Sequence, residues 1–178
     1  MERYEGFDAF VVARGAALLR TAYLLTGDRH LAEDLLQTSL SKTVRHWSRV
    51  RSGSPDAYVR QAMVRENISW HRRRRVPEVV VADVPDQPFS AGSDPDHRLA
   101  LDAALRQLTP KQRAVLVLRF YEDLTELQVS HVLGCSVGTV KSQTHRALER
   151  MRAVAPELSD LLVEVDSAAV VPTEEVAR

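Results

Sequence analysis

The chain has 178 residues, a hydrophobic fraction of 44%, and 24 acidic against 24 basic side chains. This composition is normal for a globular protein, and the length allows one domain or two small ones. The single cysteine excludes an internal disulfide framework and any zinc site that needs several cysteines.

The charges are segregated along the chain although the net charge is zero. Residues 41–75 contain ten Lys or Arg and two acidic residues. Residues 77–97 contain five acidic residues and no Lys or Arg, and residues 153–178 contain six acidic residues and one Arg. This segregation favours a polyanionic partner for the basic segment. The alternative is a solvated charged surface with no partner, which the unbroken arginine run at 72–75 disfavours.

Apolar residues recur at helical spacing in the first part of the chain and predict three helices. The first covers residues 7–27 and the second covers residues 28–47. After a turn, Ser54 is a good N-cap and Pro55 a good first residue for the third helix, which ends in the arginine run. Three helices of this length can bury one small core.

Two segments lack this periodicity. Residues 77–93 combine prolines with acidic residues and no Lys or Arg, which is typical of a flexible linker. Residues 156–178 form an acidic tail that we expect to be disordered. The N-terminus has acidic residues and no apolar segment, so it is no signal peptide, and no apolar run approaches the length of a membrane span. We therefore expect a cytoplasmic protein without membrane insertion.

Residues 94–155 predict four further helices. Asp94 and Pro95 open the first of them, and Thr109 begins the second by forming a capping box with Gln112. Leucines and valines at helical spacing supply the buried side of both helices.

The last two of these helices predict a helix-turn-helix. Thr125 forms a second capping box with Gln128, and Gly134 ends the helix because glycine adopts a left-handed conformation at little cost. Ser136 is the N-cap of the next helix. The outward face of that helix carries cations and short hydrogen-bonding side chains: Thr139, Lys141, Ser142, Gln143, His145 and Arg146. Such a face suits a helix that enters a DNA major groove, and it favours DNA binding over an ordinary helical hairpin.

The sequence contains no recognisable catalytic or metal-binding motif. A glycine-rich phosphate loop and the HExxH, GxSxG and CxxC patterns are all missing, and the six histidines are scattered. We therefore expect no enzymatic activity, no cofactor and no metal site.

Three stretches in this order resemble the extracytoplasmic-function (group IV) sigma factors of the sigma-70 family, with features of the SigE-like actinobacterial subgroup. They are LTGDRHLAEDLLQ, WSRVRSGSPDAYVRQAMVRENISWHRRRR and LTPKQRAVLVLRFYEDLTELQVSHVLGCSVGTVKSQTHRALERMR. The resemblance implies an all-α fold of two small helical domains joined by a flexible linker. It implies a three-helix region 2-like domain at residues 1–76, a linker at 77–93, a four-helix region 4-like domain at 94–155 and a tail at 156–178.

The resemblance also implies partners and contact residues. The partners are core RNA polymerase, promoter DNA and, for many relatives, an anti-sigma factor. The positions that match the polymerase-binding helix are Leu31, Asp34, Leu35, Gln37 and Thr38. The positions that match −10 element contacts are Trp47, Arg49, Arg51, Tyr58, Arg60, Gln61 and Arg65. The positions that match −35 element contacts are Thr139, Lys141, Ser142, His145 and Arg146.

Physical chemistry supports the −10 assignment, because melted DNA needs cations for its phosphates and aromatic faces for its unstacked bases. A core position for Trp47 is an equally weighted alternative, since large aromatic residues are usually buried. The same alternative applies to Leu31 and Leu35. Arg65 stands where the family often has Asn, which favours a phosphate contact over base reading at that position.

Two other functions remain open from the sequence. The chain could be a helix-turn-helix transcriptional regulator whose first domain binds an effector or dimerises, and it would then bind duplex DNA strongly on its own. It could also be a helical enzyme with a cryptic site, which a buried cluster of carboxylates or histidines in a deep pocket would indicate.

Overall fold

The computed structural model describes residues 4–73 and 95–158, and within those ranges every regular element is a helix. The first unit consists of α1 (Phe7–Thr26), α2 (Arg29–Arg45), α3 (Trp47–Val50) and α4 (Pro55–Arg73). The second consists of α5 (Pro95–Arg106), α6 (Pro110–Leu116), the π-helix η2 (Val117–Tyr121), α7 (Glu126–Leu133), α8 (Val137–Val154) and the short η3 (Pro156–Leu158). The expected all-α fold is confirmed, and the linker at 77–93 and residues 159–178 of the tail lie outside the described residues.

Local sequence signals set most of the helix boundaries. The Asp28 side chain accepts a hydrogen bond of 2.8 Å from the backbone N–H of Leu31 and so caps α2. Both predicted capping boxes are present, at Thr109 before α6 and at Thr125 before α7. Proline is the first residue of α4, as expected. These ends therefore follow from hydrogen bonds that each segment makes within itself.

Three details differ from the sequence-based expectation. The segment between the second and third predicted helices contains the one-turn helix α3, which we did not predict. The expected tail begins with η3, whose Leu158 is only 2% exposed because it packs against the second unit. Finally, α1 is by length and hydropathy long enough to cross a membrane, contrary to our expectation that no run approaches that length. A core helix of a soluble protein passes the same test, and α1 packs against α2 and α4.

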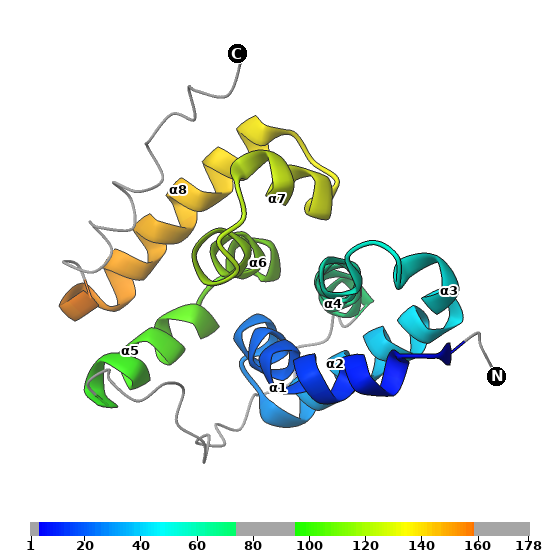
Figure 1. The fold of residues 1–178 in the computed structure, drawn as a ribbon. Helices are drawn as coiled ribbons and strands as arrows, with labels where there is room; N and C mark the ends of the chain where they lie inside the picture. The colour runs from blue at the N-terminus through cyan, green and yellow to red at the C-terminus, as the bar shows by residue number, and fades with distance from the viewer. Residues whose placement is uncertain (1–3, 74–94, 159–178) are drawn as a thin grey trace.

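The two units share one continuous hydrophobic core. Fully buried residues of α1, α2 and α4 belong to the same cluster as Val115 and Leu118 of the second unit, and α6 contacts both α1 and α4. In Figure 1, α6 lies between α8 on one side and the α1–α4 unit on the other. A smaller cluster joins α5, α8 and η3. The sequence predicted two separate cores, and the structure merges them because α6 is apolar on more than one side.

Polar contacts cross the same junction. Arg113 of α6 is 7% exposed, and its guanidinium donates hydrogen bonds to the carbonyl oxygens of Leu105, at 2.8 Å, and Leu25, at 3.4 Å. Asn67 of α4 donates to the same Leu25 oxygen at 3.2 Å. Burial lowers the pKa of Arg113 to about 10. Gly27, at φ 72°, ends α1 beside this guanidinium, where a Cβ atom would lie 3.0 Å from it.

Candidate nucleic-acid interface

The second helix of the helix-turn-helix presents its predicted face to solvent. Thr139, Lys141, Ser142, His145 and Arg146 of α8 are all exposed. The inward positions Val140, Ala147, Leu148 and Met151 are each no more than 2% exposed. The α8 helix is therefore amphipathic in the way that the sequence predicts.

The turn before α8 is built by short-range hydrogen bonds. Gly134 has φ 65°, and the N–H of Cys135 donates to the Ser130 carbonyl oxygen at 3.0 Å. Ser136 caps α8 by accepting from the N–H of Thr139 at 3.1 Å. The buried hydroxyl of Ser130 finds a partner in its own helix, because it donates to the Leu127 carbonyl oxygen at 2.7 Å. These bonds fix the angle at which α8 leaves α7.

Two of the exposed α8 side chains have acidic neighbours. Lys141 Nζ lies 3.6 Å from the Glu126 carboxylate, and His145 Nε2 lies 3.3 Å from Glu149. Both α8 side chains are about two-thirds exposed, so solvent weakens these contacts.

The first unit carries a second cationic surface, on α3, the turn that follows it and α4. Arg49, Arg51 and Arg65 are exposed there, and Arg51 lies 3.6 Å from Glu5. Tyr58 is half-buried, with its ring 6.5 Å from that of His46. A pocket of about 350 Å³ opens beside this tyrosine and is lined by Lys42, Tyr58, Gln61, Ala62, Arg65, Glu66 and Ser69. The surface thus combines cations, one aromatic face and a concave site.

The Lys42–Glu66 ion pair forms one wall of that pocket, and we did not predict it from the sequence. Glu66 is 8% exposed, and the hydrogen bond from Lys42 lowers the pKa of its carboxyl group against the opposing effect of burial. The two residues belong to different helices and are 24 positions apart, so no local spacing rule points to them.

Trp47 is a core residue in this structure. It is 3% exposed, and its ring centroid lies 5.1 Å from that of Phe7 and 5.4 Å from that of Phe10. Its indole Nε1 donates to the carbonyl oxygen of Glu5 at 2.7 Å. Its ring therefore has no face free to stack on a base. Of the two roles that the sequence left open for Trp47, the structure shows the core position.

Arg60 is partly withdrawn from solvent by an acidic residue of the other unit. Its side chain is 18% exposed, pairs with Asp56 one turn earlier, and places Nε 3.3 Å from the Glu122 carboxylate. Glu122 also accepts a hydrogen bond from the Thr21 hydroxyl. Glu122 lies just after η2 and far from Arg60 in sequence, so only the packing of the two units reveals this contact.

The predicted polymerase-binding residues all lie on α2 but differ in how far they are exposed to solvent. Asp34 and Gln37 are exposed, Leu31 and Thr38 are half-buried, and Leu35 is fully buried in the shared core. Leu35 is therefore a core residue here, as the alternative reading of the sequence allowed.

Comparisons with known proteins agree on one family. The family profile described as Sigma-70 region 2 matches residues 10–76, and the one described as Sigma-70, region 4 matches residues 98–151. The RNA polymerase sigma-E factor of Streptomyces coelicolor is 40% identical over 149 residues, which span 82% of this chain and 84% of that protein. The ECF RNA polymerase sigma factor SigL of Mycobacterium tuberculosis is 32% identical over 150 residues, spanning 80% and 85%.

A solved structure of a sigma factor has a similar fold. The co-crystal structure of the sigma factor RpoE in complex with the anti-sigma factor NepR, from Bartonella quintana, matches with a TM-score of 0.64 at 25% identity. The match covers 83% of this chain and 95% of that one.

Proposed function

The chain belongs to the sigma-70 family, and from that premise we propose how its two helical units share the work of an RNA polymerase sigma factor. The protein binds core RNA polymerase and promoter DNA, and its role is transcription initiation. The 40% identity to a Streptomyces sigma-E factor identifies it as SigE-like. We assign it no reaction of its own, and we place it in the cytoplasm with the polymerase.

The second unit supplies the −35 contacts. The supporting observation is the amphipathic α8, which buries its apolar side and exposes Thr139, Lys141 and Arg146 on the other. A helix exposed in this way can enter a major groove, with polar side chains directed at base edges and cations at phosphates.

The first unit supplies the −10 contacts and nucleates melting. Arg49, Arg51 and Arg65 are exposed and can neutralise phosphates of the separated strand. Tyr58 and Gln61 line the pocket beside them, where a base that has left the stack can be accommodated. We leave Trp47 out of this set because it is buried.

Core polymerase binds the exposed side of α2. Asp34 and Gln37 are three residues apart and therefore share one face of the helix. An anti-sigma factor is a further proposed partner, because the similar RpoE structure was determined with one bound.

Run-off transcription with core polymerase tests this function. We expect a promoter-directed transcript that depends on adding the chain, and the sequences bound by the holoenzyme supply the promoter. Arg146→Ala should lower −35-dependent transcription by about 5- to 150-fold, the effect of losing about 1–3 kcal/mol of DNA contact.

Arg150→Ala is the matched control, since it removes the same charge from an exposed position one helical turn further along α8. No transcript from any bound promoter would refute the proposal. So would strong sequence-specific duplex binding by the free chain without any effect on polymerase, because that is the behaviour of a stand-alone regulator.

A further inference from the structure

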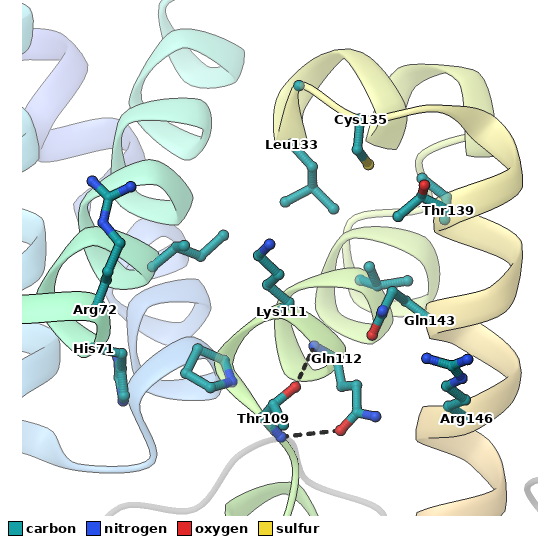
Figure 2. A pocket seen from close by; sticks show the side chains of 15 residues that line it. His71, Arg72, Thr109, Lys111, Gln112, Leu133, Cys135, Thr139, Gln143 and Arg146 are labelled. Atoms are coloured by element: carbon teal, nitrogen blue, oxygen red, sulfur yellow. Dashed lines mark hydrogen bonds between the residues drawn. The ribbon is translucent and has the colours of Figure 1, made fainter. Parts of the chain in front are cut away.

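A large cleft lies between the two units. Its volume is about 820 Å³, and its walls come from the C-terminal end of α4, the N-terminal end of α6, the turn between α7 and α8 and the first half of α8. In Figure 2, Lys111 points into the space between Arg72 on the α4 side and Arg146 on the α8 side. Because both units contribute walls, the cleft exists only while they are packed together.

The cleft combines an apolar lining with cations that lack acidic neighbours. Ile68, Val115, Leu133 and Val140 supply the apolar part. Within residues 4–73 and 95–158, no Asp or Glu lines the cleft and no carboxylate pairs with Arg72, Lys111 or Arg146. Three cations that line one partly apolar cleft, with no carboxylate paired to them in the described part of the chain, favour an anionic ligand. Such a ligand must also contain apolar side chains, because a bare polyanion would leave the apolar lining of the cleft exposed to water.

The C-terminal segment of the same chain has this chemistry. Residues 159–178 carry five carboxylate side chains and one arginine, and they include an apolar run. The acidic residues are Asp160, Glu164, Asp166, Glu174 and Glu175, and the apolar run is Leu161, Leu162 and Val163. Acidic and apolar residues alternate closely near the start of the segment, as a ligand for this cleft requires.

The position of the segment also permits the contact. It begins after Leu158, which is packed at the end of the second unit. Arg146 lies on α8 only eight residues before Val154, where the helix ends, so the cleft is about 12 Å back along the helix. An extended segment gains about 3.3 Å per residue, so a few residues span that distance and the rest can occupy the cleft.

We propose that residues 159–178 dock in the cleft between the two units as an internal acidic ligand. Their carboxylates pair with Lys111, Arg72 and Arg146, and their apolar side chains cover the lining. Docking favours the closed arrangement, since the walls of the cleft separate when the units part. It also competes with −35 DNA, because Thr139 and Arg146 belong to both surfaces; this consequence rests on the proposed function, whereas the docking does not.

The single cysteine provides a direct reporter. Cys135 is half-buried and lines the cleft, so docking should slow its alkylation by a neutral reagent such as iodoacetamide. We expect a chain that ends at Leu158 to react several-fold faster than the full chain. The triple variant Asp160→Asn, Glu164→Gln, Asp166→Asn and the cleft variant Lys111→Gln should also react faster, and salt should remove the protection in the full chain.

Matched controls separate docking from a general charge effect. The variant Asp8→Asn, Glu33→Gln, Asp123→Asn makes the same charge change at exposed positions outside residues 156–178 and should react like the full chain. A peptide of residues 159–178 should restore protection to the shortened chain. Equal rates in the full and shortened chains would overturn the proposal. Protection that depends on chain concentration would also overturn it, because the tail would then come from a second copy.

Binding to a −35 duplex tests the consequence for DNA. We expect the shortened chain to bind several-fold more tightly than the full chain, and the outside-tail control to bind like the full chain. If the cysteine is protected but the affinities are equal, the competition with DNA is refuted. Run-off transcription by the shortened chain then reports separately on the proposed function.

Discussion

At the scale of single residues, the exposed positions of α8 and the pair of exposed Lys42 with buried Glu66 illustrate two kinds of site. The α8 residues lie on one helix, so their common face follows from helical spacing. The pKa of the Glu66 carboxyl group is lowered mainly by Lys42 of α2, which donates a hydrogen bond to it although Glu66 is only 8% exposed. The pair forms a wall of the pocket beside Tyr58, so its stability bears on the proposed −10 surface.

Glu66→Gln should lower the free energy of unfolding by about 1–3 kcal/mol at neutral pH, because a charge-assisted hydrogen bond is lost. The pKa of Glu66 in the folded chain is below its ordinary value of 4.5. The folded state therefore binds fewer protons than the unfolded state, and the pair stabilises fully above pH 4.5 and loses its effect as the pH falls through the folded pKa. Urea denaturation at several pH values measures the difference.

Glu33→Gln is the control, since Glu33 forms an exposed pair with Arg29 whose loss should cost less than about 1 kcal/mol. A difference between the native chain and Glu66→Gln that stayed constant from pH 7 to pH 3 would contradict the electrostatic origin.

At the scale of elements, caps and glycines define where helices begin and end. Gly134 at φ 65° ends α7, and its position between two capped helices gives the turn of the helix-turn-helix. Gly15, by contrast, lies inside α1 and has an ordinary helical backbone conformation. At both positions a Cβ atom would meet nothing within 4 Å, so only the backbone conformation distinguishes them.

The same substitution should therefore have opposite effects at these two sites. Gly15→Ala should stabilise the chain by about 0.4–1 kcal/mol, because alanine has less conformational freedom to lose on folding. Gly134→Ala should destabilise it by about 1–2 kcal/mol, because the left-handed conformation is strained for a residue with a Cβ atom. Thermal denaturation of both variants measures this, and equal signs would refute the explanation.

At the scale of the whole molecule, the closed packing of the two units covers part of a proposed DNA surface. Glu122 of the second unit binds both Arg60 and Thr21 of the first, so it competes with phosphates for Arg60. The buried Arg113 donates a hydrogen bond across the junction to the Leu25 carbonyl oxygen of the first unit. Its lowered pKa, about 10, reflects the cost of burying this cation in the junction. The competition by Glu122 for Arg60 therefore depends on the closed packing of the two units.

Glu122→Gln should weaken the junction and release Arg60. We expect the free chain to bind a single-stranded −10 oligonucleotide several-fold more tightly, and Arg60→Gln added to this variant should remove the gain. Fluorescence anisotropy at fixed salt measures both. Asp123→Asn makes the same charge change at the next position, which is exposed, and should have little effect. Equal affinities for Glu122→Gln and Asp123→Asn would contradict competition by Glu122.

Apart from the short α3 and η3, the sequence by itself determined the helices, the predicted caps, the helix-turn-helix and the family, because each depends on periodicity, local hydrogen bonds or motifs within a short stretch. Trp47 and Leu35 could not be assigned in this way, since both binding and burial select large apolar residues. The tertiary structure placed them in the core. It also brought Glu122 to Arg60 and formed the cleft at Lys111, because contacts between residues far apart in sequence arise only when the two units pack.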